Sequence, residues 1–229
     1  MGQRGGMQRT ESPLIALAIL LAALAGFVDA LAFTSLGGFF ASFMSGNSTR
    51  LGVGLGSGSS HDAALAASLV MSFVAGVILS SVLGRARPHR HQPVVMAAVT
   101  LLLALAAIVA MLMPGPVVLL LLAAAMGTEN GVFQRDGEVT IGLTYMTGSL
   151  VKMGQKLAGA LMGDADRFGW LRYLALWLGF VSGVVIGAES QFRWGWNALW
   201  LAPIFAAVLT LLLASMTRPR ARPDLTMVR

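Results

Sequence analysis

The chain has 229 residues, of which 56% are hydrophobic and only 11% charged, and its mean hydropathy is +0.76. An average soluble domain carries about a quarter charged residues, so this composition excludes a soluble domain. The net charge of +6 comes from Lys and Arg residues scattered between apolar runs rather than gathered on one face, which argues against a nucleic-acid partner. Cysteine is absent, which excludes disulfides and thiolate metal sites.

The apolar residues form six runs long enough to cross a membrane. A bilayer core of about 30 Å requires roughly 20 apolar residues in a helix. Backbone groups cannot be left unpaired in lipid, so we expect helices rather than strands. In chain order, the expected spans are residues 13–36, 63–84, 94–113, 117–133, 170–188 and 196–216. The sequence therefore predicts an all-α, polytopic membrane helix bundle.

Two further apolar segments are interrupted by polar residues. Residues 39–55 are broken by the run 45–50, and residues 139–162 are broken by Lys152 and Lys156. Their uninterrupted portions are about a dozen residues long, a length more typical of re-entrant elements than of full spans. We expect both to be half-helices, with eight full spans as the alternative.

The distribution of basic residues supports the six-span topology. Cytoplasmic loops of membrane proteins carry the excess of Lys and Arg. With both termini in the cytoplasm, every Lys and Arg except Arg50 and Arg193 lies on that side. If both interrupted segments crossed the membrane, the basic loop at residues 85–90 would move outside.

The two halves of the chain resemble each other. Residues 26–30 (GFVDA) correspond to 127–131 (GTENG), and residues 44–47 (MSGN) correspond to 146–149 (MTGS). Small residues also recur every fourth position in both halves, a spacing that lets helix backbones approach closely in lipid. The predicted helix-packing residues are Ser72, Gly76, Ser80, Gly179, Gly183 and Gly187.

Three full spans per half would make the second half enter the membrane from the opposite side. Such an inverted-topology repeat is common in transporters, with the site at the repeat interface. We expect a cytoplasmic tail at residues 1–12, a first repeat at 13–113, a second repeat at 117–216 and a basic cytoplasmic tail at 217–229.

Two acidic residues, Asp29 and Glu129, fall inside expected spans, and Asn130 occupies the position related to Asp29. A charged group at the bilayer centre costs about 2.5 to 3.5 kcal/mol on insertion scales, so ionisable residues there are functional candidates. One interpretation is that they bind a proton, a cation or a donor group of a solute. The alternative is that each accepts hydrogen bonds from the interrupted segments.

The two related motifs place polar side chains beside a glycine that permits backbone distortion. A helix break there would present a helix N-terminus to an anion or polar solute, or would be satisfied by its own Ser and Thr side chains. The predicted pathway residues are Asp29, Met44, Ser45, Gly46, Asn47, Glu129, Asn130, Met146, Thr147, Gly148 and Ser149. Arg50 and Lys152 share a repeat position, where snorkelling to headgroups is favoured over attraction of an anion.

Motifs for catalysis and cofactors are absent from the sequence. It contains no glycine-rich phosphate loop, no His-Glu-x-x-His and no Gly-x-Ser-x-Gly. His89 and His91 are expected to belong to a solvated basic loop. We therefore expect no enzyme activity, no cofactor and no metal.

Four motifs together resemble the YoaK-like family of bacterial multi-pass membrane proteins. They are residues 26–30, 43–47 with Leu51 and Gly52, 127–131, and 145–149 with Met153 and Gly154. The resemblance implies a bacterial inner-membrane location, but the family is a domain of unknown function and supplies no binding residues. Ser45 stands where the family pattern has Thr, and Glu129 where an uncharged residue is usual.

These observations favour a small secondary transporter or permease of an unknown small solute or ion. The alternative is a non-transporting membrane partner or sensor subunit, and the small-residue faces leave a homo-oligomer open. We expect the lipid bilayer to be the main partner of the protein. If Asp29 lies in the pathway, Asp29→Asn should leave folding intact and abolish uptake.

Overall fold

The computed structural model describes residues 4–35, 37–135, 138–139 and 146–216. The α-helices in these ranges are α1 (Arg4–Ser35), α2 (Met44–Ser57), α3 (Ser60–Ala86), α4 (His91–Leu112), α5 (Pro116–Glu129), α6 (Met146–Leu161), α7 (Leu171–Trp194) and α8 (Leu201–Met216). Short 3-10 helices η1 (Pro88–Arg90), η2 (Asn130–Phe133) and η3 (Gly195–Trp200) join or extend them. A two-residue antiparallel ladder pairs β1 (Gln134–Arg135) with β2 (Glu138–Val139).

Five helical stretches in the described residues are long and apolar enough to cross a membrane. They are Leu14–Ser35, Ser60–Ala86, Pro88–Leu112, Pro116–Phe133 and Leu171–Ser215, and the last contains α7 and α8 joined by η3. The predicted class, a helical membrane bundle, is confirmed. The largest differences from the expected boundaries are at α1, which begins at Arg4 within the expected tail, and at α7, which continues beyond residue 188 to Trp194.

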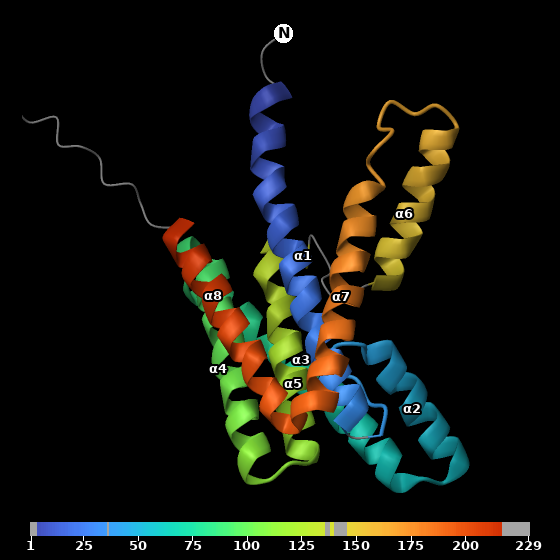
Figure 1. The fold of residues 1–229 in the computed structure, drawn as a ribbon, viewed down its shortest axis with the longest axis vertical. Coiled ribbons are helices and arrows are strands. Elements are labelled where there is room, and N and C mark those ends of the chain that lie inside the picture. Colours follow the sequence, from blue (N-terminus) through green and yellow to red (C-terminus); the bar gives the residue numbers. More distant parts are fainter. Residues whose placement is uncertain (1–3, 36, 136–137, 140–145, 217–229) are drawn as a thin grey trace, which may run out of the picture.

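Helices α2 and α6 have only 14 and 16 residues, and among the described residues no 3-10 helix lengthens them as η2 lengthens α5 and η3 lengthens α8. At 1.5 Å per residue they extend about 21 Å and 24 Å, less than a bilayer core of about 30 Å. Figure 1 shows that α2 starts in the lower half of the molecule and ends at its lower end, where α3 begins. Helix α6 starts at mid-height beside α7 and ends near the upper end, where the chain turns into α7. Helix α2 therefore returns to the lower end of the molecule, where α1 also ends.

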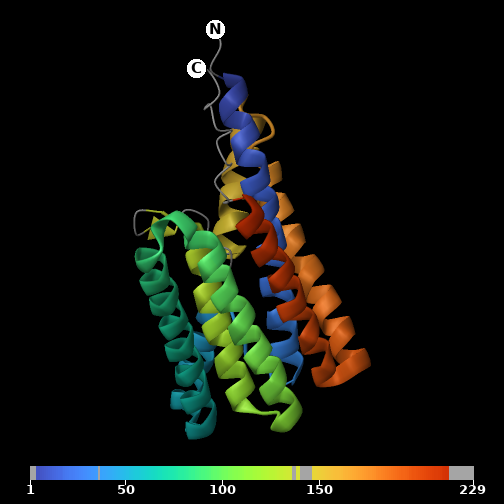
Figure 2. The ribbon, with the colours of Figure 1, turned by 90° about the vertical axis from the view of Figure 1, so that its left-hand side faces the viewer.

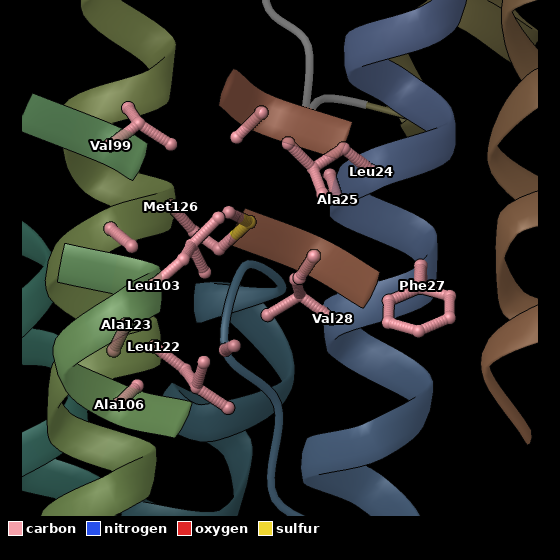
Figure 3. Packing of buried hydrophobic residues seen from close by; sticks show 14 of the residues in the cluster. Leu24, Ala25, Phe27, Val28, Val99, Leu103, Ala106, Leu122, Ala123 and Met126 are labelled. Atoms are coloured by element: carbon pink, nitrogen blue, oxygen red, sulfur yellow. The ribbon is translucent and has the colours of Figure 1, made fainter. Parts of the chain in front are cut away.

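The long helices form two groups, and each group contains one helix from the other half of the chain: α5 lies with α3 and α4, and α1 lies with α7 and α8. Figure 2 shows α3, α4 and α5 together on one side, and α1, α7 and α8 on the other. The closest pairings are α1 with α7 and α3 with α5, and α4 contacts α8 between the groups. In the close-up of the core, buried Leu24 and Val28 of α1 are drawn with Leu103 of α4 and with Leu122 and Met126 of α5 (Figure 3).

Small residues let the paired helices touch through their backbones. A methyl group added at Gly76 would overlap the carbonyl oxygen of Ala124, and one at Gly183 would overlap that of Ala23. Ser72 Oγ donates to the Leu120 carbonyl oxygen at 2.6 Å. The six residues predicted to pack helices all lie at these contacts: Ser72, Gly76 and Ser80 of α3 against α5 and η2, and Gly179, Gly183 and Gly187 of α7 against α1.

Candidate functional site

A loop at residues 37–43 folds back from the end of α1 and is held by Asp29. The Asp29 side chain is only 4% exposed. Its Oδ1 accepts hydrogen bonds from the N–H groups of Ala41, at 2.8 Å, and Ser42, at 2.6 Å, and its Oδ2 accepts one from Ser42 Oγ at 2.6 Å. Backbone groups at membrane depth require such partners, because lipid offers none. This geometry matches the alternative in which the carboxyl group serves the interrupted segment.

Asn47 of α2 holds the same loop from its other side. Its side chain is fully buried. Its Nδ2 donates to the Phe40 carbonyl oxygen at 2.7 Å, and its Oδ1 accepts from the Phe40 N–H at 3.1 Å. The amide therefore satisfies both backbone groups of Phe40, as a neighbouring β-strand would.

Arg50 also binds the loop, which corrects the expectation that it snorkels to headgroups. Its Nη1 donates to the Gly38 carbonyl oxygen at 2.8 Å, and its guanidinium carbon lies 3.9 Å from the centre of the Phe39 ring. Gly38 has a φ of 80°, in the left-handed region that a side chain disfavours. The planar guanidinium combines a directed donor with stacking on the ring.

We expect Arg50→Lys to lower the stability of the loop although the charge is kept. A lysine ammonium cannot stack as guanidinium does, so the cation–π contact, worth about 1 to 2 kcal/mol when desolvated, is weakened. The melting temperature of the purified protein and the hydrogen exchange of residues 37–43 measure the effect. Lys152→Arg, at the related position of α6, is the control and should leave the exchange of residues 37–43 unchanged.

A pocket of about 650 Å³ lies beside this loop and joins the two halves of the chain. Asp29, Ser42 and Phe43 line it from the first half, and Met146 and Phe180 line it from the second. Phe40 also lines the pocket, and its ring centre lies 5.2 Å from that of Phe43. The pocket is thus the place where the start of α6 meets the loop that leads into α2.

Glu129, the last residue of α5, has a different environment from Asp29. Its side chain is fully buried, and neither carboxyl oxygen has a hydrogen-bond partner among the described residues. Within the same residues, the ion pairs join His61 to Asp62, Lys156 to Asp166 and Arg193 to Glu189. Asp29 of α1 lies within electrostatic range of Glu129. Two acidic side chains therefore lie in one region of the interior.

The other predicted pathway residues differ in how deeply they are buried. Asn130 is buried and donates to the Met126 carbonyl oxygen of its own helix at 2.8 Å. Ser149 is also buried, whereas Met44, Gly46 and Met146 are half-buried and Ser45, Thr147 and Gly148 are exposed.

Sequence reasoning missed the role of Ser42 and misassigned His91. Ser42 gives two hydrogen bonds to Asp29, but nothing in its surrounding sequence distinguishes it. His91 is half-buried rather than part of a solvated loop, and its Nε2 lies 2.6 Å from the Gly131 carbonyl oxygen. Its place directly after the basic loop concealed that contact.

Long apolar helices paired through backbone contacts, with polar residues enclosed between them, define a polytopic α-helical membrane protein. The chain belongs to the family described as "Protein of unknown function (DUF1275)", which matches residues 17–212. This confirms the resemblance to YoaK-like proteins.

Two relatives are similar over most of their length. The UPF0700 transmembrane protein RA0705 of Rhizobium meliloti (strain 1021) is 34% identical over 211 residues, which cover 89% of this chain and 87% of the relative. The UPF0700 transmembrane protein YoaK of Bacillus subtilis (strain 168) is 26% identical over 189 residues, covering 76% of this chain and 83% of the relative. No solved structure matches the chain.

Proposed function

We propose that this protein is a small secondary transporter or permease of the bacterial inner membrane. It would have six full spans, two re-entrant half-helices and both termini in the cytoplasm. An unidentified small solute or ion would pass between two inverted repeats that alternate access. In this proposal the chain is not an enzyme, and it binds no nucleic acid.

The observation that carries the proposal is a reciprocal set of helix contacts. Gly26 of α1 abuts the Phe180 carbonyl oxygen of α7, and its counterpart Gly127 of α5 abuts the Phe73 carbonyl oxygen of α3. In the same way, Gly183 meets Ala23, and its counterpart Gly76 meets Ala124. The sequence correspondence between the halves thus coincides with a correspondence of contacts, as an inverted repeat requires.

The central contact between the halves agrees with the same symmetry. Thr100 of α4 and Thr210 of α8 lie with their Oγ1 atoms 3.1 Å apart. Each also bonds the carbonyl oxygen four residues earlier in its own helix, Met96 at 2.9 Å and Ala206 at 2.8 Å. Both threonines begin the same run, Thr-Leu-Leu-Leu-Ala, in the last helix of their half. A contact between such equivalent residues supports the proposed pseudo-two-fold relation between the repeats.

The half-helices support a pathway through the shared pocket. α2 begins at Met44, directly after the pocket residue Phe43, and α6 begins at the pocket residue Met146. In many transporters, discontinuous helices direct their N-terminal ends, which carry partial positive charge, at the bound solute. The bias of basic residues toward one side supports the proposed orientation.

Single cysteines in this naturally cysteine-free chain test the proposal without knowledge of the solute. We expect Phe43→Cys and Met146→Cys to react with a membrane-impermeant maleimide in both right-side-out and inverted vesicles, because an alternating pathway opens the pocket to each side. Leu101→Cys, on a 70% exposed apolar face, and Leu103→Cys, in the core, are the unreactive controls. If both pocket positions were as unreactive as these controls, a partner or sensor subunit would replace the transporter proposal.

A further inference from the structure

Glu129 is not required by the helix packing that surrounds it. By the repeat correspondence, Glu129 matches Val28 of α1, which is fully buried without a polar group. The neighbouring residues Gly127 and Thr128 make the contacts with α3: Gly127 abuts Phe73, and Thr128 Oγ1 donates to the Gly76 carbonyl oxygen at 3.2 Å. The carboxyl group therefore occupies a position at which the related helix α1 has an apolar side chain.

The titratable groups around this end of α5 do not neutralise a charge on Glu129. Asp29 of α1 is acidic and is occupied by the loop at residues 37–43. His91 of α4 directs its Nε2 at the Gly131 carbonyl oxygen, and Arg85 of α3 is exposed. Among the described residues, a carboxylate at position 129 would thus have no hydrogen-bond donor and no paired cation.

The two buried acids therefore have different tasks. A carboxylate buried in an apolar environment without donors is costly, whereas a carboxyl group that holds its own proton is much less so. Asp29 receives three hydrogen bonds that stabilise a negative charge, and Glu129 receives none. Asp29 is suited to hold the loop, and Glu129 is suited to bind and release a proton.

We propose that Glu129 is the proton-binding site of this protein and that its protonation is coupled to the change of access. In the conformation described here the Glu129 carboxyl group carries a proton. When α1 and α5, which touch at few positions, separate to admit water, an Oε–H bond breaks and the proton passes to that water. The inference rests on the proposed transport function, and it names the proton as the coupling ion.

Infrared spectroscopy of the protein in lipid tests the protonation itself. At neutral pH we expect a carbonyl stretching band of a protonated carboxylic acid that shifts when glutamate is labelled with ¹³C and disappears in Glu129→Gln. Glu189→Gln, at the exposed partner of Arg193, should keep the band, and so should Asp29→Asn. Absence of a glutamate-dependent band would overturn the proposal, and isotope labelling decides this in the wild-type protein even if Glu129→Gln does not fold.

A second measurement tests the coupling. We expect the maleimide reaction rate of Met146→Cys, relative to that of an unfolded reference peptide, to depend on pH and to become independent of pH when Glu129→Gln is added. A pH-independent ratio in the parent variant would overturn the coupling to Glu129. If Met146→Cys still reacted from both sides in that case, the transport proposal would stand, whereas a lack of reaction from either side would overturn the transport proposal itself.

Discussion

Replacing Gly26 or Gly127 with valine is expected to destabilise the folded state by about 3 kcal/mol or more. Each glycine abuts a carbonyl oxygen of the partner helix, Phe180 and Phe73 respectively, so a side chain must push two helix axes apart. Overpacking of a core costs about 1 to 3 kcal/mol when side chains can adjust, and rigid backbone partners place these variants at or above the upper end. Melting temperature and the monodisperse fraction after gel filtration measure the loss.

Matched controls exist in both halves. Gly52 and Gly154 are exposed helical residues at corresponding repeat positions, and a methyl group there would meet no atom within 4 Å. We expect Gly52→Ala and Gly154→Ala to be neutral or to stabilise the helix by about 0.5 to 1 kcal/mol. Wild-type stability in Gly26→Val would show that α1 and α7 do not pack as described.

Asp29→Ala is expected to release the loop at residues 37–43 and to destabilise the protein. The substitution leaves the N–H groups of Ala41 and Ser42 and the Ser42 hydroxyl without an acceptor. Each buried donor without a partner costs about 1 to 3 kcal/mol, so the total loss should be about 3 kcal/mol or more. Faster hydrogen exchange at residues 40–43 and a lower melting temperature would report it.

Asp29→Asn should have a smaller effect of the same kind. The amide keeps one acceptor oxygen but presents an NH₂ group to donors of the loop. This outcome differs from the expectation that Asp29→Asn leaves the fold intact and acts only on uptake. Unchanged hydrogen exchange in both Asp29 variants would contradict the assignment of Asp29 to the loop.

The spans were predictable because lipid imposes a simple rule on sequence. The expected span at residues 117–133 agrees closely with α5 and η2, which cover Pro116–Phe133, and the expected span at 94–113 agrees with α4. Helix ends outside the apolar runs were harder to predict. α7 continues to Trp194 through polar residues. Arg193 and Glu189, four residues apart on this last part of the helix, form an ion pair at 2.6 Å, which an analysis of apolar runs does not detect.

The roles of the two acids were not predictable to the same degree. Their burial follows from their place in apolar runs, but the donors to Asp29 come from residues 41 and 42 in a loop whose path depends on Asn47 and Arg50. No periodic pattern encodes that path. The isolation of Glu129 is likewise a property of what surrounds it, because its neighbours Thr128 and Asn130 bond carbonyl oxygens instead.

The pairing of α1 with α7 also constrains how the protein is made. During synthesis α1 is complete before α3, α4 and α5 exist, and α7 emerges near the end of the chain. The face of α1 that carries Gly26 must therefore contact lipid or an insertion factor until α7 has been synthesised. A ribosome that stalls between α5 and α7 would leave an orphaned helix in the membrane, a substrate for quality-control proteolysis rather than a half-sized functional unit.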